Sequence, residues 1–423
     1  KCYNFQHMHT ETSSHLWDSS DLYRNSVLEL MEATRAMKLD PNIAERLKVP
    51  KRALIVSVPI RCDDGSIRVF EGYRVQHNMT LGPGKGGIRF HPEVSLSETA
   101  GLGGAKGVIR VDPTQLSRQE AQALTRRYTT EINMIIGPDR DIPAPDVGTD
   151  GQTMAWMMDT FSQEKGFAIP GVVTGKPVEI GGSLGRAEST GRGVVYTIRH
   201  AVKHLDSIGK KAPKLDSSTT VAVHGFGKVG NIAALEISQL GARVVAVSDV
   251  SGGIYNKNGL NIPEIMKYAE RNRGVAGYPE AEAISNEDLL ALDVDILIPA
   301  AIDGVITDAN VNNVKARIIA EGANGPISSS ATRVLEDRGA FIIPDVLCNA
   351  GGVVVSYFEW VQGLQSFFWS EEEVNEKLAS VMESAFKRVV AQQAKFRCGM
   401  KTAALITGVD RLNKAMLLRG LFP

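Results

Sequence analysis

Two lysines lie in glycine-rich surroundings, and both residue types and spacing suit acid–base chemistry. Lys85 is part of GPGKGGIRFHP and Lys106 is part of GGAKG. A lysine that is desolvated among backbone groups can have its pKa lowered towards neutrality, so that it can polarise a carbonyl or activate water. Asp146, in IPAPDVGT, could carry protons beside such a lysine. A single lysine in a glycine loop is more often solvated and inert. The hypothesis of an acid–base site therefore depends on the two lysines and Asp146 together.

A second group of residues has the spacing of a dinucleotide-binding turn. The residues that match GxGxxG are Gly225, Phe226, Gly227, Lys228, Val229 and Gly230. The apolar run VAVH precedes them and the helix-like segment NIAALEISQL follows. In this pattern the glycines permit a tight turn, close approach of a pyrophosphate and close helix–strand packing, while the helix N-terminus attracts the anion. The alternative is a strand–turn–helix that binds nothing.

Asp249 ends the next apolar run, 19 positions after Gly230. A carboxylate at this place can bind the ribose hydroxyls of a dinucleotide and would repel a 2′-phosphate. The sequence therefore predicts NAD as the cofactor, with NADP as the alternative.

Short apolar runs alternate with helix-length stretches in the second half of the chain. The runs are VAVHGFGKVG (221–230), ARVVAVSD (242–249), DILIPAA (295–301), RIIAEGAN (317–324) and AFIIPD (340–345). They lack the alternation of half-exposed strands, which is typical of a buried parallel sheet. We predict a doubly wound α/β fold of the Rossmann type here.

The first half reads as mixed α and β. Helical spacing of apolar residues extends over 22–47, and two strand-like segments begin at residues 52 and 66 around a CDDG turn. A helix is expected near 117–136. Towards the C-terminus, Ser370 and Glu373 form a capping-box pattern before a helix, and a second helix is expected over 401–418.

Composition excludes several classes of protein. The 423 residues predict two or three domains. A net charge of -1 gives no bias towards nucleic acid, and no apolar run approaches the roughly 18 residues of a membrane span. No metal site is expected, because His7, His9 and His15 read as a solvated tail. The scattered cysteines suit a reducing compartment, either the cytoplasm or, in a eukaryote, the mitochondrial matrix; they are Cys2, Cys62, Cys348 and Cys398.

Seven motifs together resemble the glutamate dehydrogenase family, whose relatives include leucine, phenylalanine and valine dehydrogenases. They are GPGKGGIRFHPEV, GGAKG, DIPAPDVGT, AESTGRGV, VHGFGKVG, EGANGP and DVLCNAGGVVVSYFEWVQ. The resemblance runs from about residue 20 to the C-terminus. It implies a mixed α/β substrate-binding and oligomerisation domain over 1–180, to which a C-terminal helix, 400–423, returns. It also implies an NAD-binding Rossmann domain over 181–399 and a homohexamer.

The resemblance also implies roles for individual residues. Lys106 matches the catalytic lysine of the family and Asp146 its proton-transferring aspartate. The residues that match the pocket for the substrate side chain are Lys85, Ala144, Val353 and Ser356. Thr190 and Asn324 match groups that hold the nicotinamide amide and ribose. The implied reaction is reversible oxidative deamination of L-glutamate to 2-oxoglutarate and ammonium.

One segment departs from the family pattern. Between HPEV and GGAKG the family has a longer stretch with a lysine that binds the substrate α-carboxylate, whereas residues 95–102 here are short and contain no lysine. Because the flanking motifs are intact, we interpret this as a stretch from which residues are missing. If the shortening is real, the alternative is a catalytically impaired dinucleotide-binding homologue. A dehydrogenase of branched or aromatic amino acids is the other alternative.

Overall fold

The computed structural model describes Trp17 and residues 19–420 of the chain. His7, His9 and His15 lie outside the described residues. Contacts divide the chain into two units. Unit 1 extends to Gly182 and adds Glu359–Phe368 and the chain from Val409, whereas unit 2 contains Ser183–Phe358 and Trp369–Gly408. Each unit is described by itself.

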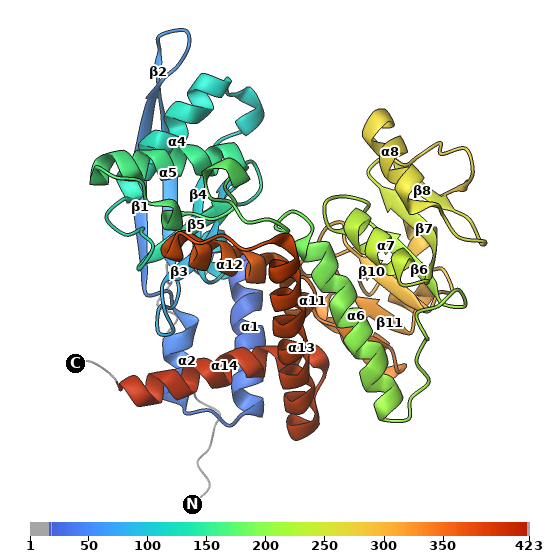
Figure 1. Ribbon diagram of the computed structural model, residues 1–423. Coiled ribbons are helices and arrows are strands. Elements are labelled where there is room, and N and C mark those ends of the chain that lie inside the picture. The colour runs from blue at the N-terminus through green and yellow to red at the C-terminus, as the bar shows by residue number, and fades with distance from the viewer. Residues whose placement is uncertain (1–16, 18, 421–423) are drawn as a thin grey trace, which may run out of the picture. The chain divides into compact units, whose positions relative to one another are not determined.

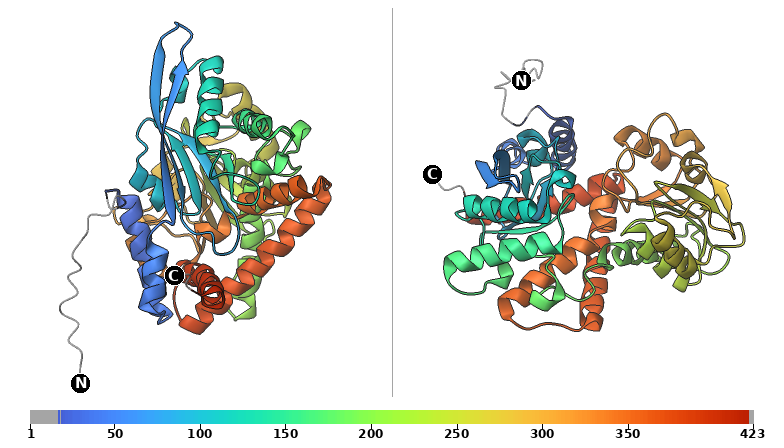
Figure 2. Two further views of the ribbon diagram at one scale, coloured as in Figure 1. Left: turned by 90° about the vertical axis from the view of Figure 1, so that its left-hand side faces the viewer. Right: turned by 90° about the horizontal axis from the view of Figure 1, so that it is seen from above.

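Unit 1 is built on a five-stranded sheet with the order β1-β2-β4-β3-β5. Its strands are β1 (Arg52–Arg61), β2 (Ile67–Gln76), β3 (Gly84–Phe90), β4 (Ala105–Ile109) and β5 (Asp141–Pro145). β2 pairs antiparallel with both β1 and β4, and β3 pairs parallel with both β4 and β5. The predicted hairpin at CDDG is confirmed, with Gly65 in the left-handed region (φ 81°). Figure 2 shows this long hairpin projecting from the sheet.

Two helices, α4 (Arg118–Ile132) and α5 (Gly151–Lys165), cover one face of this sheet (Figure 1). The helix predicted near 117–136 is confirmed as α4, and a capping box between Ser117 and Glu120 begins it. Leu124 and Tyr128 of α4 are fully buried against strand residues such as Ile88. This core packs against β3, an interior strand between β4 and β5, which matters because β3 carries Lys85.

The helical pattern over 22–47 forms two helices, α1 (Asp21–Ala36) and α2 (Pro41–Lys48). The break has a local cause: Asp40 caps α2 through the Asn42 amide, and Pro41 is favoured at a first helical position. The final helix, α14 (Met400–Arg419), confirms the prediction for 401–418. In unit 1 its Val409 and Met416 pack with Ile43 and Leu47 of α2.

Unit 2 contains a seven-stranded sheet with the order β12-β11-β10-β6-β7-β8-β9. Its strands are β6 (Thr220–His224), β7 (Arg243–Asp249), β8 (Gly252–Tyr255), β9 (Glu282–Ile284), β10 (Ile296–Pro299), β11 (Ile318–Ala320) and β12 (Phe341–Ile343). The five runs predicted as parallel strands are confirmed as β6, β7, β10, β11 and β12. The strand order reverses at β6 and β10, where ligands bind in such folds.

Strands β8 and β9 form an antiparallel edge that the sequence did not predict. Only two residues connect Asp249 to Gly252, whereas a parallel neighbour needs a crossover of a dozen or more residues. The chain must therefore turn back on itself.

The remaining helices surround the second sheet or connect the units. They are α6 (Ser189–Ser207), α7 (Gly230–Gln239), α8 (Ile262–Asn272), α9 (Asn286–Leu290), α10 (Ser329–Asp337), α11 (Asp345–Cys348), α12 (Gly351–Gln365) and α13 (Glu371–Phe396). The capping box of Ser370 and Glu373 begins α13 as predicted. Along the described residues, no helix combines the length and apolar character that a membrane span needs.

Candidate active site

Three neighbouring strands of unit 1 bring Lys106 and Asp146 together. β4 carries Lys106, Asp146 directly follows β5, and both strands pair with β3. The Lys106 ammonium donates a hydrogen bond to the Asp146 carboxylate, although 40 positions separate the two residues. The glycine at position 87 of β3 makes room for this pair, since a Cβ there would lie 2.7 Å from the Asp146 Cβ.

The other carboxylate oxygen of Asp146 is held by an arginine. Arg89 Nε donates to Asp146 Oδ1 over 2.8 Å, and Arg89 Nη1 lies 3.2 Å from Glu98 Oε1. The Thr149 hydroxyl accepts from the Asp146 amide and donates to the Ile88 carbonyl, which fixes the backbone. Both carboxylate oxygens therefore have cationic partners in a defined orientation.

This arrangement shifts both pKa values. Burial lowers the pKa of Lys106 below the ordinary lysine value, and the attraction of Asp146 offsets this only in part. Burial alone would raise the pKa of Asp146, but Lys106 and Arg89 outweigh it and the net direction is downwards. Asp146 is therefore ionised at neutral pH, and Lys106 loses its proton more readily than a solvated lysine. Such shifts are typical of acid–base sites.

Lys85 lies on β3 in the same unit, and its ammonium is 2.5 Å from the Thr174 hydroxyl. Ala144, on β5, is buried and pairs in register with Gly87. Four predicted site residues are thus carried by the β3, β4 and β5 region of unit 1: Lys85, Ala144, Lys106 and Asp146.

Two buried ion pairs support this region. The guanidinium of Arg74 is paired with Asp141, both side chains being fully buried, and Arg74 Nη1 also donates to the Gly86 carbonyl over 3.2 Å. Arg74 thereby links β2 to β3 and β5. Lys176 and Glu359, also fully buried, form an ion pair of 2.7 Å. Glu359 accepts from the backbone amides of residues 175 and 176, next to Thr174.

Sequence reasoning missed Arg89, Thr174 and these buried pairs. A usable signal existed for Arg89, because residues two apart on a strand share a face and Lys85, Gly87 and Arg89 follow that period. No such signal existed for Thr174, which is 89 positions from Lys85.

In unit 2, the GxGxxG turn has the close contacts that the fingerprint requires. Gly225 is in the left-handed region (φ 99°), and a Cβ there would lie 2.5 Å from the Ala301 amide nitrogen. A Cβ on Gly230 would lie 1.8 Å from the Gly225 carbonyl oxygen. In contrast, a Cβ on Gly227 would meet no protein atom within 4 Å. The backbone at Gly227 is therefore approachable from outside, as a bound pyrophosphate needs.

The turn leads into helix α7, whose N-terminus has no side-chain cap. Phe226 is buried in the core, Val229 packs against it, and Lys228 is exposed. At the ends of β6 and β7, His224 Nδ1 and Ser248 Oγ are buried without a hydrogen-bond partner among the described residues. Free helix amides and unpaired polar atoms at a switch point fit a dinucleotide phosphate and ribose.

Asp249 stands at the end of β7 with its carboxylate in a fixed orientation. Its Oδ1 accepts from the Ser251 amide over 2.8 Å, and its Oδ2 accepts from the Val275 amide over 2.9 Å. The Ser251 hydroxyl also donates to Oδ1, so Oδ2 is the oxygen that can accept a further bond, and the position predicted for ribose binding retains acceptor capacity there.

The other predicted residues of unit 2 lie near the start of α6, on α12 and after β11. Thr190 is the second residue of α6, and a Cβ on Gly352 would lie 2.4 Å from its hydroxyl. Val353 and Ser356 belong to α12, where Val353 is exposed and Ser356 is buried. Asn324 is exposed, and its Oδ1 accepts from the Asn349 side chain over 2.7 Å.

The short segment before GGAKG forms helix α3 (Leu96–Gly101), and β4 follows after three residues. Gly103 and Gly104 make this tight connection in left-handed conformations (φ 67° and 60°). The interpretation that residues are missing here stays a prediction. The short segment is continuous in the structure. It contains no lysine.

Comparison with known proteins gives a consistent family assignment. Residues 181–420 match the profile described as Glutamate/Leucine/Phenylalanine/Valine dehydrogenase. A glutamate dehydrogenase of Thermotoga maritima is 50% identical over 418 positions, covering 95% of this chain and 99% of that protein. A catabolic NAD-specific glutamate dehydrogenase of Bacillus subtilis is 42% identical, covering 95% of this chain and 97% of that protein.

Solved structures agree. The leucine-bound form of a hetero-hexameric glutamate dehydrogenase from Thermus thermophilus superposes with a TM-score of 0.89 at 37% identity, covering 96% of this chain and 99% of that one. The N-terminal profile, described as the Glu/Leu/Phe/Val dehydrogenase dimerisation domain, matches in two pieces, 50–103 and 99–163, which meet at the short α3 segment. The alignment with the Thermotoga maritima enzyme has 418 positions but includes only 95% of the 423 residues of this chain. Some positions of that enzyme therefore have no counterpart here. The chain thus belongs to the Glu/Leu/Phe/Val dehydrogenase family.

Proposed function

We propose that the protein catalyses the reversible oxidative deamination of L-glutamate with NAD. Glutamate, NAD⁺ and water give 2-oxoglutarate, ammonium, NADH and a proton. The observation that carries this proposal is the ion pair of Lys106 and Asp146, in which a buried lysine of lowered pKa faces an ionised carboxylate. The names of the relatives, which are glutamate dehydrogenases at 42–50% identity, support the choice of substrate.

The pair supplies the acid–base chemistry. Lys106, when it has lost its proton, takes a proton from the water that attacks the substrate imine, and its ammonium form stabilises the charge of the carbinolamine. Asp146 accepts and returns the protons that leave and join the amino group. Their contact allows protons to pass between them without free solvent. Arg89 acts through Asp146 and is therefore a positioning residue.

The substrate side chain is assigned to the pocket residues Lys85, Ala144, Val353 and Ser356. A second carboxylate among apolar groups is costly to desolvate unless it meets a cation and hydrogen-bond donors. Lys85 provides the cation and Ser356 a hydroxyl, while Ala144 and Val353 contact the methylene groups.

The dinucleotide is assigned to unit 2. The backbone of residues 225–230 and the N-terminus of α7 would hold the pyrophosphate, and Asp249 the adenosine ribose. Thr190 and Asn324 would hold the nicotinamide amide and ribose. A nicotinamide held there would supply the acceptor for the hydride of the substrate α-carbon. The NAD-specific relative supports NAD over NADP.

Turnover of a panel of amino acids with NAD tests this function. Turnover is measured by the absorbance of the reduced nicotinamide, and we expect glutamate to give the highest kcat/KM. Higher kcat/KM for leucine or phenylalanine would instead support the dehydrogenase of branched or aromatic amino acids.

The short α3 segment favours one second candidate, a catalytically impaired dinucleotide-binding homologue. The segment offers no lysine for the substrate α-carboxylate, and Arg89, the cation beside the Lys106–Asp146 pair, is already bonded to Asp146 and Glu98. NAD binding without measurable turnover of any amino acid would select this candidate.

The assembly and the location are proposed as a homohexamer in the cytoplasm. The solved relative from Thermus thermophilus is described as hetero-hexameric, which supports six subunits. Light scattering of the purified protein would measure the number of chains, and a stable monomer or dimer would contradict the hexamer.

A further inference from the structure

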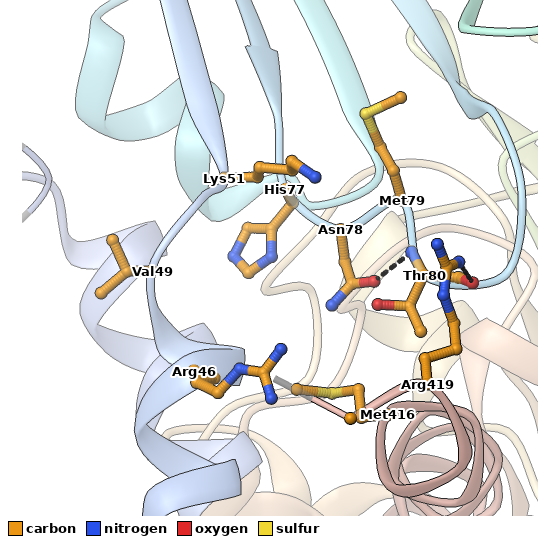
Figure 3. A pocket seen from close by; sticks show the side chains of 10 residues that line it. Arg46, Val49, Lys51, His77, Asn78, Met79, Thr80, Met416 and Arg419 are labelled. Carbon is orange, nitrogen blue, oxygen red and sulfur yellow. Dashed lines mark hydrogen bonds between the residues drawn. The ribbon is translucent and has the colours of Figure 1, made fainter. Parts of the chain in front are cut away.

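A cavity of about 420 Å³ in unit 1 lies apart from the residues assigned above. Its walls come from α2, from the connection between β2 and β3, and from the end of α14 (Figure 3). Figure 3 shows the Arg46 guanidinium and the His77 ring directed into the same hollow, with Thr80 and Arg419 on the opposite side. Its volume is within the range of small-molecule sites.

The charged residues that line this cavity are all cationic. Among the described residues, Arg46, Lys51 and Arg419 line it and no aspartate or glutamate does. Within the described part of the chain, the side chains of Arg46 and Lys51 have no hydrogen-bond or ion-pair partner. Arg419 uses one donor, from Nη1 to the Thr80 carbonyl oxygen over 2.6 Å, and has others left. Three like charges around one cavity repel each other, and an anion between them would remove that repulsion.

We propose that this cavity binds a small polyvalent oxyanion, whose phosphate or carboxylate groups are held by Arg46, Lys51 and Arg419. Arginine donors in a planar fork match the oxygens of phosphate and carboxylate, and lysine adds a point charge. The three cations lie on three separate segments, α2, the residue before β1 and α14, so one anion would bridge them. Met416 and Val49 complete the wall with apolar groups.

The wall of the cavity is connected through the backbone to both active-site lysines. The His77 amide donates to the Gly104 carbonyl over 2.8 Å, two residues before Lys106. Thr80, which accepts from Arg419, lies five residues before Lys85 on the same connection. An anion that draws these side chains inwards therefore acts on the segments that precede both lysines. On this basis we expect the anion to change the KM for glutamate, an effect that rests on the proposed function.

Calorimetric titration of the NAD-saturated protein with inorganic pyrophosphate tests the site without relying on catalysis, because NAD then occupies the turn at 225–230 that is itself assigned to a pyrophosphate. We expect one site per chain with a dissociation constant below about 1 mM. The double variant Arg46→Gln with Lys51→Gln should bind at least about tenfold more weakly. Lys211→Gln with Lys214→Gln, which removes two exposed lysines of unit 2, is the matched control and should bind like the wild type. Citrate in place of pyrophosphate shows whether carboxylates serve as well as phosphates.

Two outcomes would overturn the site: no binding up to 10-fold above that concentration, or equal losses in both double variants, which would show unspecific attraction. A kinetic arm then tests the coupling. In the wild type, saturating pyrophosphate at constant ionic strength should change the KM for glutamate by about fivefold or more, and the Arg46–Lys51 variant should not respond. Binding without a kinetic effect would refute the coupling between the anion and the KM for glutamate, while the anion site itself would remain supported. Absence of any turnover would refute the proposed function and leave the calorimetric result standing.

Discussion

The Lys106 ammonium and the Asp146 carboxylate form a hydrogen-bonded ion pair across β3, the strand of unit 1 that pairs in parallel with both β4 and β5. The pair is mostly buried, with side-chain exposures of 11% and 18%. Burial is what makes it reactive, because it lowers the pKa of Lys106 while Arg89 and Lys106 keep Asp146 ionised. An exposed pair of the same residues would retain ordinary pKa values and have little catalytic use.

Removing either member should abolish most of the turnover. We expect Lys106→Ala and Asp146→Asn each to lower kcat by about 10²–10⁴-fold, the usual worth of acid–base groups. Binding of NAD, measured by fluorescence titration, should be retained, because the cofactor residues lie in unit 2. Lys257→Ala, at an exposed lysine, is the control. Near-normal turnover in either active-site variant would refute the assignment.

The pH profile should respond to Arg89. Its charge lowers the pKa of both Lys106 and Asp146. Since Lys106 acts after losing its proton, kcat/KM should rise with pH through the lowered pKa of Lys106. Arg89→Gln removes a cause of that lowering, so the rise should move to higher pH. Arg89→Lys keeps the charge and should move it less. A profile that stays in place, or moves to lower pH, would show that Arg89 does not tune the pair.

Local patterns in the sequence predicted much of this fold. The five parallel strands of unit 2 were recognisable because each is a short apolar run with its own flanking turn. The capping box of Ser370 and Glu373 and the hairpin at CDDG depend on residues within a few positions of each other. The GxGxxG turn was recognisable for the same reason, since all its constraints fall within six residues.

What the sequence could not predict depends on long-range packing. Arg74 and Asp141 are 67 positions apart, and nothing near either residue indicates that both would be fully buried. The antiparallel direction of β8 followed from a two-residue connection that reads like any other turn. The close packing of Lys85 with Thr174 depends on the whole of unit 1 being folded.

Cofactor choice should depend on the charge of Asp249. We expect the wild type to have a higher kcat/KM with NAD than with NADP, because the carboxylate would repel a 2′-phosphate. Asp249→Asn keeps the shape and removes the charge, so the ratio of NADP to NAD should rise. Ser251→Ala keeps the charge of Asp249 and removes a hydroxyl that donates to Asp249 and accepts from the Ala276 amide, so it should change the ratio less. A wild type that prefers NADP would contradict this assignment.

Substrate choice should depend on Lys85 and Ser356. Glutamate brings a second carboxylate into the pocket, and its oxygens need an ammonium and a hydroxyl to replace water. A long apolar amino acid such as norleucine would instead leave the Lys85 charge without its substrate partner, so the wild type should reject it. The double variant Lys85→Leu with Ser356→Val should therefore lower kcat/KM for glutamate and raise it for norleucine.

The size of this change follows from the strength of the contacts. Charged hydrogen bonds contribute about 1.5–3 kcal/mol each, and neighbouring contributions seldom add fully. The ratio of kcat/KM for glutamate to that for norleucine should thus fall by at least about tenfold in the double variant. Thr174→Val is the informative control, because Thr174 contacts Lys85 through its hydroxyl and the variant keeps the charge of the pocket. It should weaken glutamate binding while still rejecting norleucine. An unchanged ratio in the double variant would mean that a different cation receives the side-chain carboxylate.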